Sequence, residues 1–356
     1  MGVFDKILKN NESVFADDVA LDYDYVPKLM PYRSNEQFKI ATAIKPLFAE
    51  RNGKNIIVVG KPGIGKTLAI KHIMKELEEE TDDIVPIYVN CWQKNTSYKV
   101  LLEICDILGY KFTQNKKTEE LFSIIKEIVN KKSAVFVFDE VDKSEEIDVL
   151  YTLIEQVYRK TLIMITNYKS WLENLDLRVQ SRLTPELIEF QPYNADETKG
   201  ILENRMKYAF QPDVWDSEAF ALVIKKATSL ADVRSGLYLM RESGNSAEDR
   251  ASKKIEVQDV KIAIKKLDDF TVKKKDDLDE ETQKIYTIIK SNPDQKIGEL
   301  FKVYEKEGGE MTYKTFQRKI EKLDKGQYIE KEKISGGKDG KTTIIHLNKN
   351  TSLDDY

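Results

Sequence analysis

Residues 60–67, Gly-Lys-Pro-Gly-Ile-Gly-Lys-Thr, carry the pattern of a phosphate-binding loop and constrain the fold more than any other feature of the chain. The β-branched run 55–59 precedes the loop and predicts a strand buried on both faces of a parallel sheet. The helical pattern of residues 68–80 follows it directly. A glycine turn arising by chance would lack this strand and helix, so the pattern indicates a nucleotide site.

The chemistry of the loop follows from its residue types. Glycines let the backbone curl so that successive N–H groups and a helix N-terminus face the phosphates. Lys66 would reach the β and γ phosphates, and the Thr67 hydroxyl would ligate Mg²⁺. We therefore predict that ATP or ADP binds at Gly60, Pro62, Gly63, Ile64, Gly65, Lys66, Thr67 and Leu68.

Strand and helix patterns alternate through the first half of the chain. Residues 84–90, 134–138 and 161–166 read as further strands, with a largely helical region at 97–130. Alternation of this kind predicts an α/β fold with a doubly wound parallel sheet, which we place at residues 34–191.

The second half contains different patterns. Residues 192–270 read as a small helical lid, and 271–280 are a charged run that suits a linker or an exposed helix end. Residues 281–350 show three helices and then two short strands around a glycine-rich tip. This order predicts a winged helix.

Polar side chains follow two of the predicted strands, at the edge where α/β sheets place ligands. Asp139 and Glu140 end the strand at 134–138, and Asn167 ends the one at 161–166. Asp139 would hold Mg²⁺, Glu140 would polarise the attacking water, and Asn167 could orient that water. Taken alone, acidic residues after a strand are also common solvated loop ends, and asparagine often caps a turn.

Together these features resemble the archaeal origin-recognition initiators, AAA+ ATPases similar to the largest eukaryotic origin-recognition subunit and to the helicase-loading initiator. The resemblance covers nearly the whole chain and rests on short matches outside the loop. Two positions depart from the family pattern: Tyr32 stands where histidine is frequent, and Ala231 where the lid motif begins with glycine. The matching segments are 24–27, 31–33, 89–91, 138–140, 166–167, 177–182, 190–193, 201–205 and 232–234.

The resemblance implies roles for further residues. Asn167 would be the sensor-1 residue, and Arg234 would be the sensor-2 arginine brought by the lid. The N-terminal segment 1–33 would lie near the adenine pocket. Either Arg178 or Arg182 would serve as the arginine finger for a neighbouring subunit, and the choice between them stays open. Further nucleotide contacts would come from Val26, Arg33, Tyr193 and Arg205.

The predicted winged helix is locally basic. Residues 311–346 hold nine Lys or Arg against five Asp or Glu, within a chain of net charge −4. Thr312 suits an N-cap, from which a helix could present four side chains to a DNA major groove while the hairpin meets the backbone. A winged helix used for protein contact would be the alternative. The predicted DNA contacts are Lys314, Thr315, Gln317, Arg318, Lys338 and Lys341.

Composition excludes several other classes. No stretch approaches the roughly 20 apolar residues that span a bilayer, and the N-terminus lacks the apolar core of a signal peptide. Two cysteines and two histidines are too few for a disulfide framework or a zinc site. We therefore expect a cytoplasmic, nucleoid-associated protein.

The resemblance implies a replication initiator that binds double-stranded origin DNA, hydrolyses ATP slowly as a molecular switch, and helps to recruit or load the replicative helicase. Paralogous initiators are expected partners, with a monomer in solution assembling on DNA. Two alternatives stay open at this point: a winged-helix signalling NTPase, and a helicase-loading or transposition-type ATPase that acts through protein partners.

Overall fold

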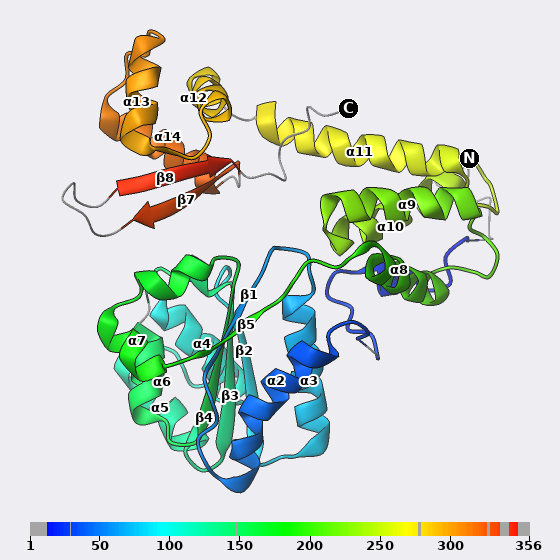
Figure 1. The fold of residues 1–356 in the computed structure, drawn as a ribbon. Coiled ribbons are helices and arrows are strands. Elements are labelled where there is room, and N and C mark those ends of the chain that lie inside the picture. The colour runs from blue at the N-terminus through cyan, green and yellow to red at the C-terminus, as the bar shows by residue number, and fades with distance from the viewer. Residues whose placement is uncertain are drawn as a thin grey trace. The chain divides into compact units, whose positions relative to one another are not determined.

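The computed structural model describes residues 13–28, 30–146, 148–276, 279–325, 328–334 and 342–347. The chain divides into two compact units, Met1–Ala263 and Ile264–Tyr356. Each unit is built around its own sheet (Figure 1).

The first unit contains a five-stranded sheet whose neighbouring strands are all parallel. Its strand order is β2-β3-β4-β1-β5, so β1 and the phosphate-binding loop after it lie between β4 and β5. Four strands agree with the sequence prediction. The edge strand β5 was not predicted, because Glu-Leu-Ile-Glu is short and half charged. The strands are β1 Ile56–Val59, β2 Ile84–Asn90, β3 Ser133–Asp139, β4 Lys160–Thr166 and β5 Glu186–Glu189.

Helices cover both faces of this sheet, which confirms the doubly wound α/β class (Figure 1). One face packs against α2 Ser34–Ile44 and α3 Lys66–Glu80. The other packs against α4 Ser97–Ile107, α5 Thr118–Val129, α6 Asp148–Gln156 and α7 Leu177–Leu183. Because β1, β3 and β4 are buried along their whole length, their sequences are nearly continuous apolar runs.

Short elements shape the edges of the core. Helix α2 ends at Ile44, and Pro46 lies in the first turn of the 3₁₀ helix η2 Lys45–Ala49. Proline fits there because the first turn of a helix needs no internal N–H donor. Two further 3₁₀ helices, η3 Val141–Lys143 and η4 Lys169–Asn174, follow β3 and β4.

The helical lid consists of α8 Ala195–Ala209, α9 Ser217–Leu230, α10 Val233–Asp249 and the start of α11 Val257–Asp276. Asn194, Asp216 and Asp232 each accept backbone N–H groups at a helix start. Helix α11 continues to Asp276, so the first part of the predicted linker 271–280 is helical.

The N-terminal segment packs on this lid. The 3₁₀ helix η1 Asp18–Leu21 lies against α8 and α10, and the Ala16 N–H donates to the Ala209 carbonyl at 2.9 Å. A Cβ built at Gly244 would lie 2.3 Å from the Phe15 ring, so only glycine allows this approach. Residues 13–22 therefore form part of the lid.

Among its described residues, the second unit holds the rest of α11, three further helices and a three-stranded antiparallel sheet of order β6-β8-β7. Its core includes Tyr304 and Phe316, both fully buried. The arrangement matches the predicted winged helix, with the two-residue strand β6 as an addition. Its elements are α12 Glu280–Ser291, β6 Gln295–Lys296, α13 Ile297–Lys306, α14 Tyr313–Lys325, β7 Ile329–Ile334 and β8 Thr342–Leu347. Among the described residues of the whole chain, none belongs to a helix long and apolar enough to cross a membrane.

Ala231 adopts a left-handed backbone conformation, with φ of +50°, at the C-terminal end of α9. Glycine tolerates this conformation without the clash that a Cβ produces. We expect Ala231→Gly to raise the free energy of unfolding by about 0.5–1 kcal/mol, because relief of the strain exceeds the added unfolded-state entropy. Chemical denaturation measures the change.

A matched control lies in the same helix. Ala227 is buried inside α9, and Ala227→Gly should lower the free energy of unfolding by about 1 kcal/mol. Equal destabilisation by both substitutions would contradict the strain at Ala231.

Candidate functional site

The phosphate-binding loop joins β1 to α3 and depends on its glycines. Gly63 and Gly65 have φ of +76° and +85°. A Cβ at Gly65 would lie 2.8 Å from the Tyr193 hydroxyl oxygen, and one at Gly63 would lie 2.0 Å from an oxygen of Asp232. The lid and the segment after β5 therefore approach the loop closely, and only glycine fits at these two positions.

Lys66 is held at the centre of the loop. Its Nζ donates to the carbonyls of Gly60 at 2.7 Å and Lys61 at 2.8 Å, and to Asn167 Oδ1 at 2.8 Å. Burial lowers the pKa of this ammonium to about 8, against the opposing attraction of Asp139. The structure therefore joins the predicted loop lysine to the predicted sensor-1 asparagine.

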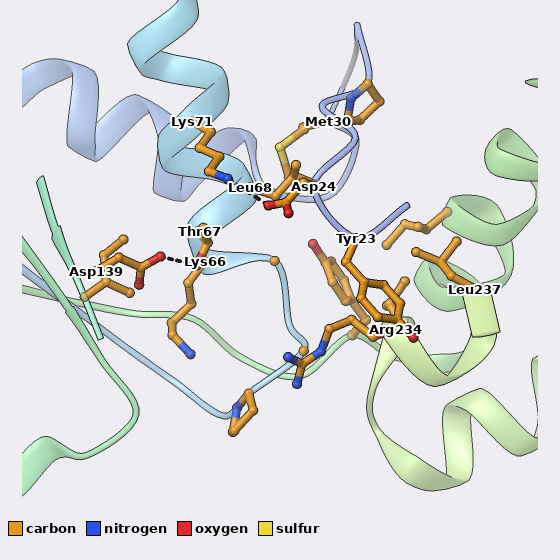
Figure 2. Close-up of a pocket in the computed structure, with 18 of the residues that line it drawn as sticks. Tyr23, Asp24, Met30, Lys66, Thr67, Leu68, Lys71, Asp139, Arg234 and Leu237 are labelled. Carbon is orange, nitrogen blue, oxygen red and sulfur yellow. Dashed lines mark hydrogen bonds and ion pairs between the residues drawn. The ribbon is translucent and has the colours of Figure 1, made fainter. Parts of the chain in front are cut away.

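The acidic end of β3 faces the start of α3. Asp139 Oδ2 accepts the hydroxyls of Thr67 at 2.7 Å and Tyr88 at 2.8 Å, while Oδ1 accepts the Glu140 N–H at 2.9 Å (Figure 2 shows the Thr67 bond). The two predicted metal ligands thus lie in direct contact. Burial beside Asp139 raises the pKa of the Tyr88 hydroxyl above its usual range, so it remains a donor.

Glu140 lies next to the two predicted metal ligands. Burial, with Asp139 and Asp142 nearby, raises the pKa of its carboxyl. Its backbone is left-handed, with φ of +53°, where β3 passes into η3. The conformation is unusual for glutamate and ends the strand at this residue.

These residues surround a cavity of about 600 Å³ in the first unit. Its wall combines the loop, the ends of β2, β3 and β4, the N-terminal segment and the lid (Figure 2). The predicted residues that line it are Pro62, Gly63, Gly65, Lys66, Thr67, Leu68, Asp139, Glu140, Asn167, Tyr193, Arg205 and Arg234.

Four predicted nucleotide contacts, all of them described residues, lie outside that lining: Val26, Gly60, Ile64 and Arg33. The Arg33 guanidinium is buried and donates to the carbonyls of Ile64 at 3.0 Å and Gln191 at 2.6 Å. It also lies 3.9 Å from the centre of the Tyr193 ring. Arg33 therefore contacts the loop and Tyr193 from outside the cavity lining.

Two lid arginines reach the cavity in different ways. Arg205 is buried, donates to the carbonyls of Ala20 and Tyr25, and lies over the Tyr25 ring at 4.7 Å. Arg234 is half exposed and pairs with Asp232 at 3.3 Å (Figure 2 shows Arg234 at the cavity). Arg205 thus holds the N-terminal segment, while Arg234 makes a local ion pair with Asp232 at the cavity.

The two candidate arginine fingers lie on α7, among described residues outside the cavity lining. Arg178 is largely exposed, and its guanidinium donates to both carboxylate oxygens of Asp176. Arg182 pairs with Glu155 and lies 5.5 Å from the centre of the Tyr151 ring. Both surface ion pairs are of the weak kind that a partner could replace.

Sequence reasoning named no role for several lining residues, among them Lys71, Tyr88, Asn90 and Asn204, and it included Tyr23 and Asp24 only as part of the segment 1–33 expected near the adenine pocket. Lys71 pairs with Asp24 at 2.9 Å and lies 5.3 Å from the centre of the Tyr88 ring (Figure 2 shows the ion pair). Lys71 could have been found one helical turn after Thr67, on the same side of α3. Tyr88 gave no signal within a mostly apolar strand.

The predicted DNA contacts belong to the second unit. Lys314, Gln317 and Arg318 are exposed on α14, and Thr315 is half-buried. Thr312 Oγ1 accepts the Thr315 N–H at 3.4 Å, consistent with the expected N-cap. Lys338 and Lys341 lie outside the described residues.

The parallel sheet, the phosphate-binding loop, the acidic strand end and the helical lid define an AAA+ ATPase. A family model for an AAA domain matches residues 49–171. A second model, for the Cdc6 AAA+ ATPase-type lid domain, matches residues 199–265.

Curated relatives identify the family. The chain is 30% identical to ORC1-type DNA replication protein 2 of Methanosarcina acetivorans, over 95% of this chain and 94% of that protein. It is 30% identical to ORC1-type DNA replication protein 1 of Sulfolobus acidocaldarius, over 91% of this chain and 87% of that protein. The chain belongs to the ORC1-type DNA replication proteins, as its resemblance to archaeal initiators predicts.

Solved structures agree with this assignment. The Aeropyrum pernix ORC1 protein, determined in complex with DNA, has 25% identity and a TM-score of 0.69, and the match covers 96% of this chain and 98% of that one. The Aeropyrum pernix ORC2 protein in its ADP form shares the fold, with 16% identity, a TM-score of 0.68 and 95% coverage of both chains.

The buried position of Arg33 predicts a specific loss on mutation. Arg33→Met leaves the Ile64 and Gln191 carbonyls without their donor, so the free energy of unfolding should fall by about 1–3 kcal/mol. Nucleotide affinity should fall as well, because the loop loses its support. Denaturant unfolding and nucleotide titration measure the two effects.

Arg51 is exposed and provides the control. Arg51→Met should change both quantities little. If Arg33→Met kept wild-type stability and affinity, a supporting role for Arg33 would be wrong.

Proposed function

We propose that this protein is an ATP-dependent replication initiator that binds double-stranded origin DNA and uses its nucleotide state as a conformational switch. The observation that carries the proposal is one cavity lined by the phosphate-binding loop, the acidic end of β3 and a lid arginine. Family membership adds the biological setting, and the DNA complex of the Aeropyrum pernix relative supports a DNA ligand.

The loop suits a nucleoside triphosphate. Gly63 and Gly65 leave a cradle that a Cβ would fill, with backbone N–H groups and the start of α3 at its floor. Lys66 would exchange its two carbonyl acceptors for phosphate oxygens. Tyr193, whose hydroxyl lies over Gly65, would wall the same cradle.

The donor set at the end of β3 suits Mg²⁺, which prefers oxygen ligands. Thr67 and Asp139 would hold the ion through their paired oxygens, and bound Mg²⁺ would neutralise phosphate charge. Glu140 would polarise the attacking water, aided by its raised pKa, and Asn167 would orient that water while holding Lys66.

Arg234 would report the nucleotide state to the lid. Its Asp232 partner caps α10 and lies against Gly63, so a phosphate drawing Arg234 away would act on the start of a lid helix. Slow hydrolysis would reset this switch. Arg178 or Arg182 would complete the site of a neighbouring paralogous initiator.

Helix α14 would enter the DNA major groove. Lys319 and Lys322 pair with Asp279, whereas Lys314 and Arg318 are exposed on the same helix. Thr315 and Gln317 would contact bases, and Lys338 and Lys341 would contact the backbone. The replicative helicase would be the protein partner, and the nucleoid within the cytoplasm would be the place of action.

The nucleotide part of the proposal is tested by Lys66→Ala. Loss of the ammonium removes the charge that would hold the β and γ phosphates, so we expect ATP and ADP binding to fall below detection by calorimetry. The second unit has its own core, so the variant should keep its affinity for duplex DNA. Wild-type nucleotide affinity in the variant would contradict the assigned loop.

The DNA part is tested by salt dependence. In full-length protein, replacing Lys314 and Arg318 by alanine should make the slope of log K against log salt shallower by about 1 for each phosphate that the variant no longer neutralises. Fluorescence anisotropy on origin and random duplexes measures the slopes. Lys302→Ala, an exposed change on α13, should leave the slope unchanged.

If the wild-type protein showed no salt-sensitive DNA affinity, the initiator proposal would fail. A signalling ATPase, or one that loads helicase through protein contacts, would then describe the chain better.

A further inference from the structure

Tyr88 is one of the polar side chains lining the cavity to which the proposed reaction assigns no role. It lies in β2, is partly buried, and donates its hydroxyl to Asp139 Oδ2 at 2.8 Å. The same oxygen accepts the Thr67 hydroxyl at 2.7 Å. Tyr88 therefore bonds to the oxygen that already contacts the other predicted metal ligand.

Three donors hold this carboxylate. Tyr88 and Thr67 occupy Oδ2, and the Glu140 N–H donates to Oδ1 at 2.9 Å. Backbone N–H groups cannot change position without moving β3, and Thr67 would turn its oxygen toward a bound ion. The Tyr88 hydroxyl is then the side-chain donor that keeps Oδ2 in place while Thr67 acts as a ligand.

Tyr88 is itself contacted by Lys71 of α3. Lys71 Nζ lies 5.3 Å from the centre of its ring, within the range of a cation–π contact. Lys71 in turn pairs with Asp24 of the N-terminal segment at 2.9 Å (Figure 2). A chain of contacts thus runs from the N-terminal segment through α3 and β2 to Asp139.

Strand pairing places this contact. In the parallel register of β2 and β3, Asn90 pairs with Asp139 and Tyr88 pairs with Val137. Tyr88 is therefore two residues before the strand end, and its long side chain reaches the carboxylate from the neighbouring strand. A phenylalanine at this position would keep the ring and its packing but lose the donor.

We propose that Tyr88 is a positioning residue for the metal-binding carboxylate, which it holds in the orientation that receives Mg²⁺ beside Thr67. This inference rests on the proposed binding of nucleotide together with Mg²⁺. Its consequence is specific: Tyr88 strengthens the contribution of Mg²⁺ to nucleotide affinity and leaves nucleotide affinity without the metal unchanged. Partners that orient a metal ligand commonly contribute 10–100-fold to metal affinity.

The test uses full-length Tyr88→Phe. ATP affinity is measured by calorimetry over a series of free Mg²⁺ concentrations and again with excess EDTA. We expect the Mg²⁺ concentration for half-maximal effect to rise by about tenfold, with unchanged ATP affinity in EDTA. The unfolding midpoint without nucleotide should also stay close to wild type, because the ring and its neighbours remain.

Tyr110→Phe is the matched control. Tyr110 packs on the α4 and α5 face of the core, among described residues outside the cavity lining. This variant should keep the wild-type response to Mg²⁺. A shift of equal size in both variants would overturn the role of Tyr88.

The remaining outcomes are distinct. An unchanged Mg²⁺ response in Tyr88→Phe overturns this inference and leaves the proposed function intact. Equal loss of ATP affinity with and without Mg²⁺ also overturns it and makes Tyr88 a direct nucleotide contact. If wild-type protein binds ATP identically with and without Mg²⁺, the metal site of the proposed function fails first, and the inference fails with it.

Discussion

The parallel register of the five-stranded sheet is the constraint on which the site depends. Val59 pairs with Thr166, and Asn90 pairs with Asp139, so the strands end level with one another at their carboxyl edge. The phosphate-binding loop, the acidic pair and Asn167 all leave the sheet at that edge. A slip of one residue in β1 or β4 would turn the side chains of that strand to the opposite face and separate Lys66 from Asn167.

Local sequence patterns predicted the parts of the fold that one segment determines by itself. Four buried strands, the lid helices and the three helices of the winged unit each follow from an apolar period and its turn signals. The strand β5 was not predicted, because Ile188 is its single buried position and one buried residue between charged neighbours gives no apolar pattern. Lys66, Thr67 and Asp139 were predicted for the same reason as the strands, since the loop and the strand end are contiguous motifs.

The missed residues depend on contacts between distant segments. The Asp24–Lys71 pair and the Tyr88–Asp139 bond join residues separated by 47 and 51 positions, and no local period records them. Arg33 and Arg205 show a related difference. Both were expected to contact nucleotide, and Arg205 lines the cavity whereas Arg33 does not. The guanidinium groups of both donate to backbone carbonyls, which a sequence cannot single out because every residue carries one.

The packing of residues 13–22 on the lid bears on how the protein can be divided. A shortened chain beginning at residue 34 would lack Phe15, which packs against Gly244, and Asp24, which pairs with Lys71. Arg205 would also lose its two backbone acceptors, the carbonyls of Ala20 and Tyr25. Such a fragment would keep the phosphate-binding loop, the acidic strand end and Asn167 but would lose the part of the cavity wall that the N-terminal segment forms. The ATPase unit therefore includes the segment from residue 13 onward, well before its first strand begins at Ile56.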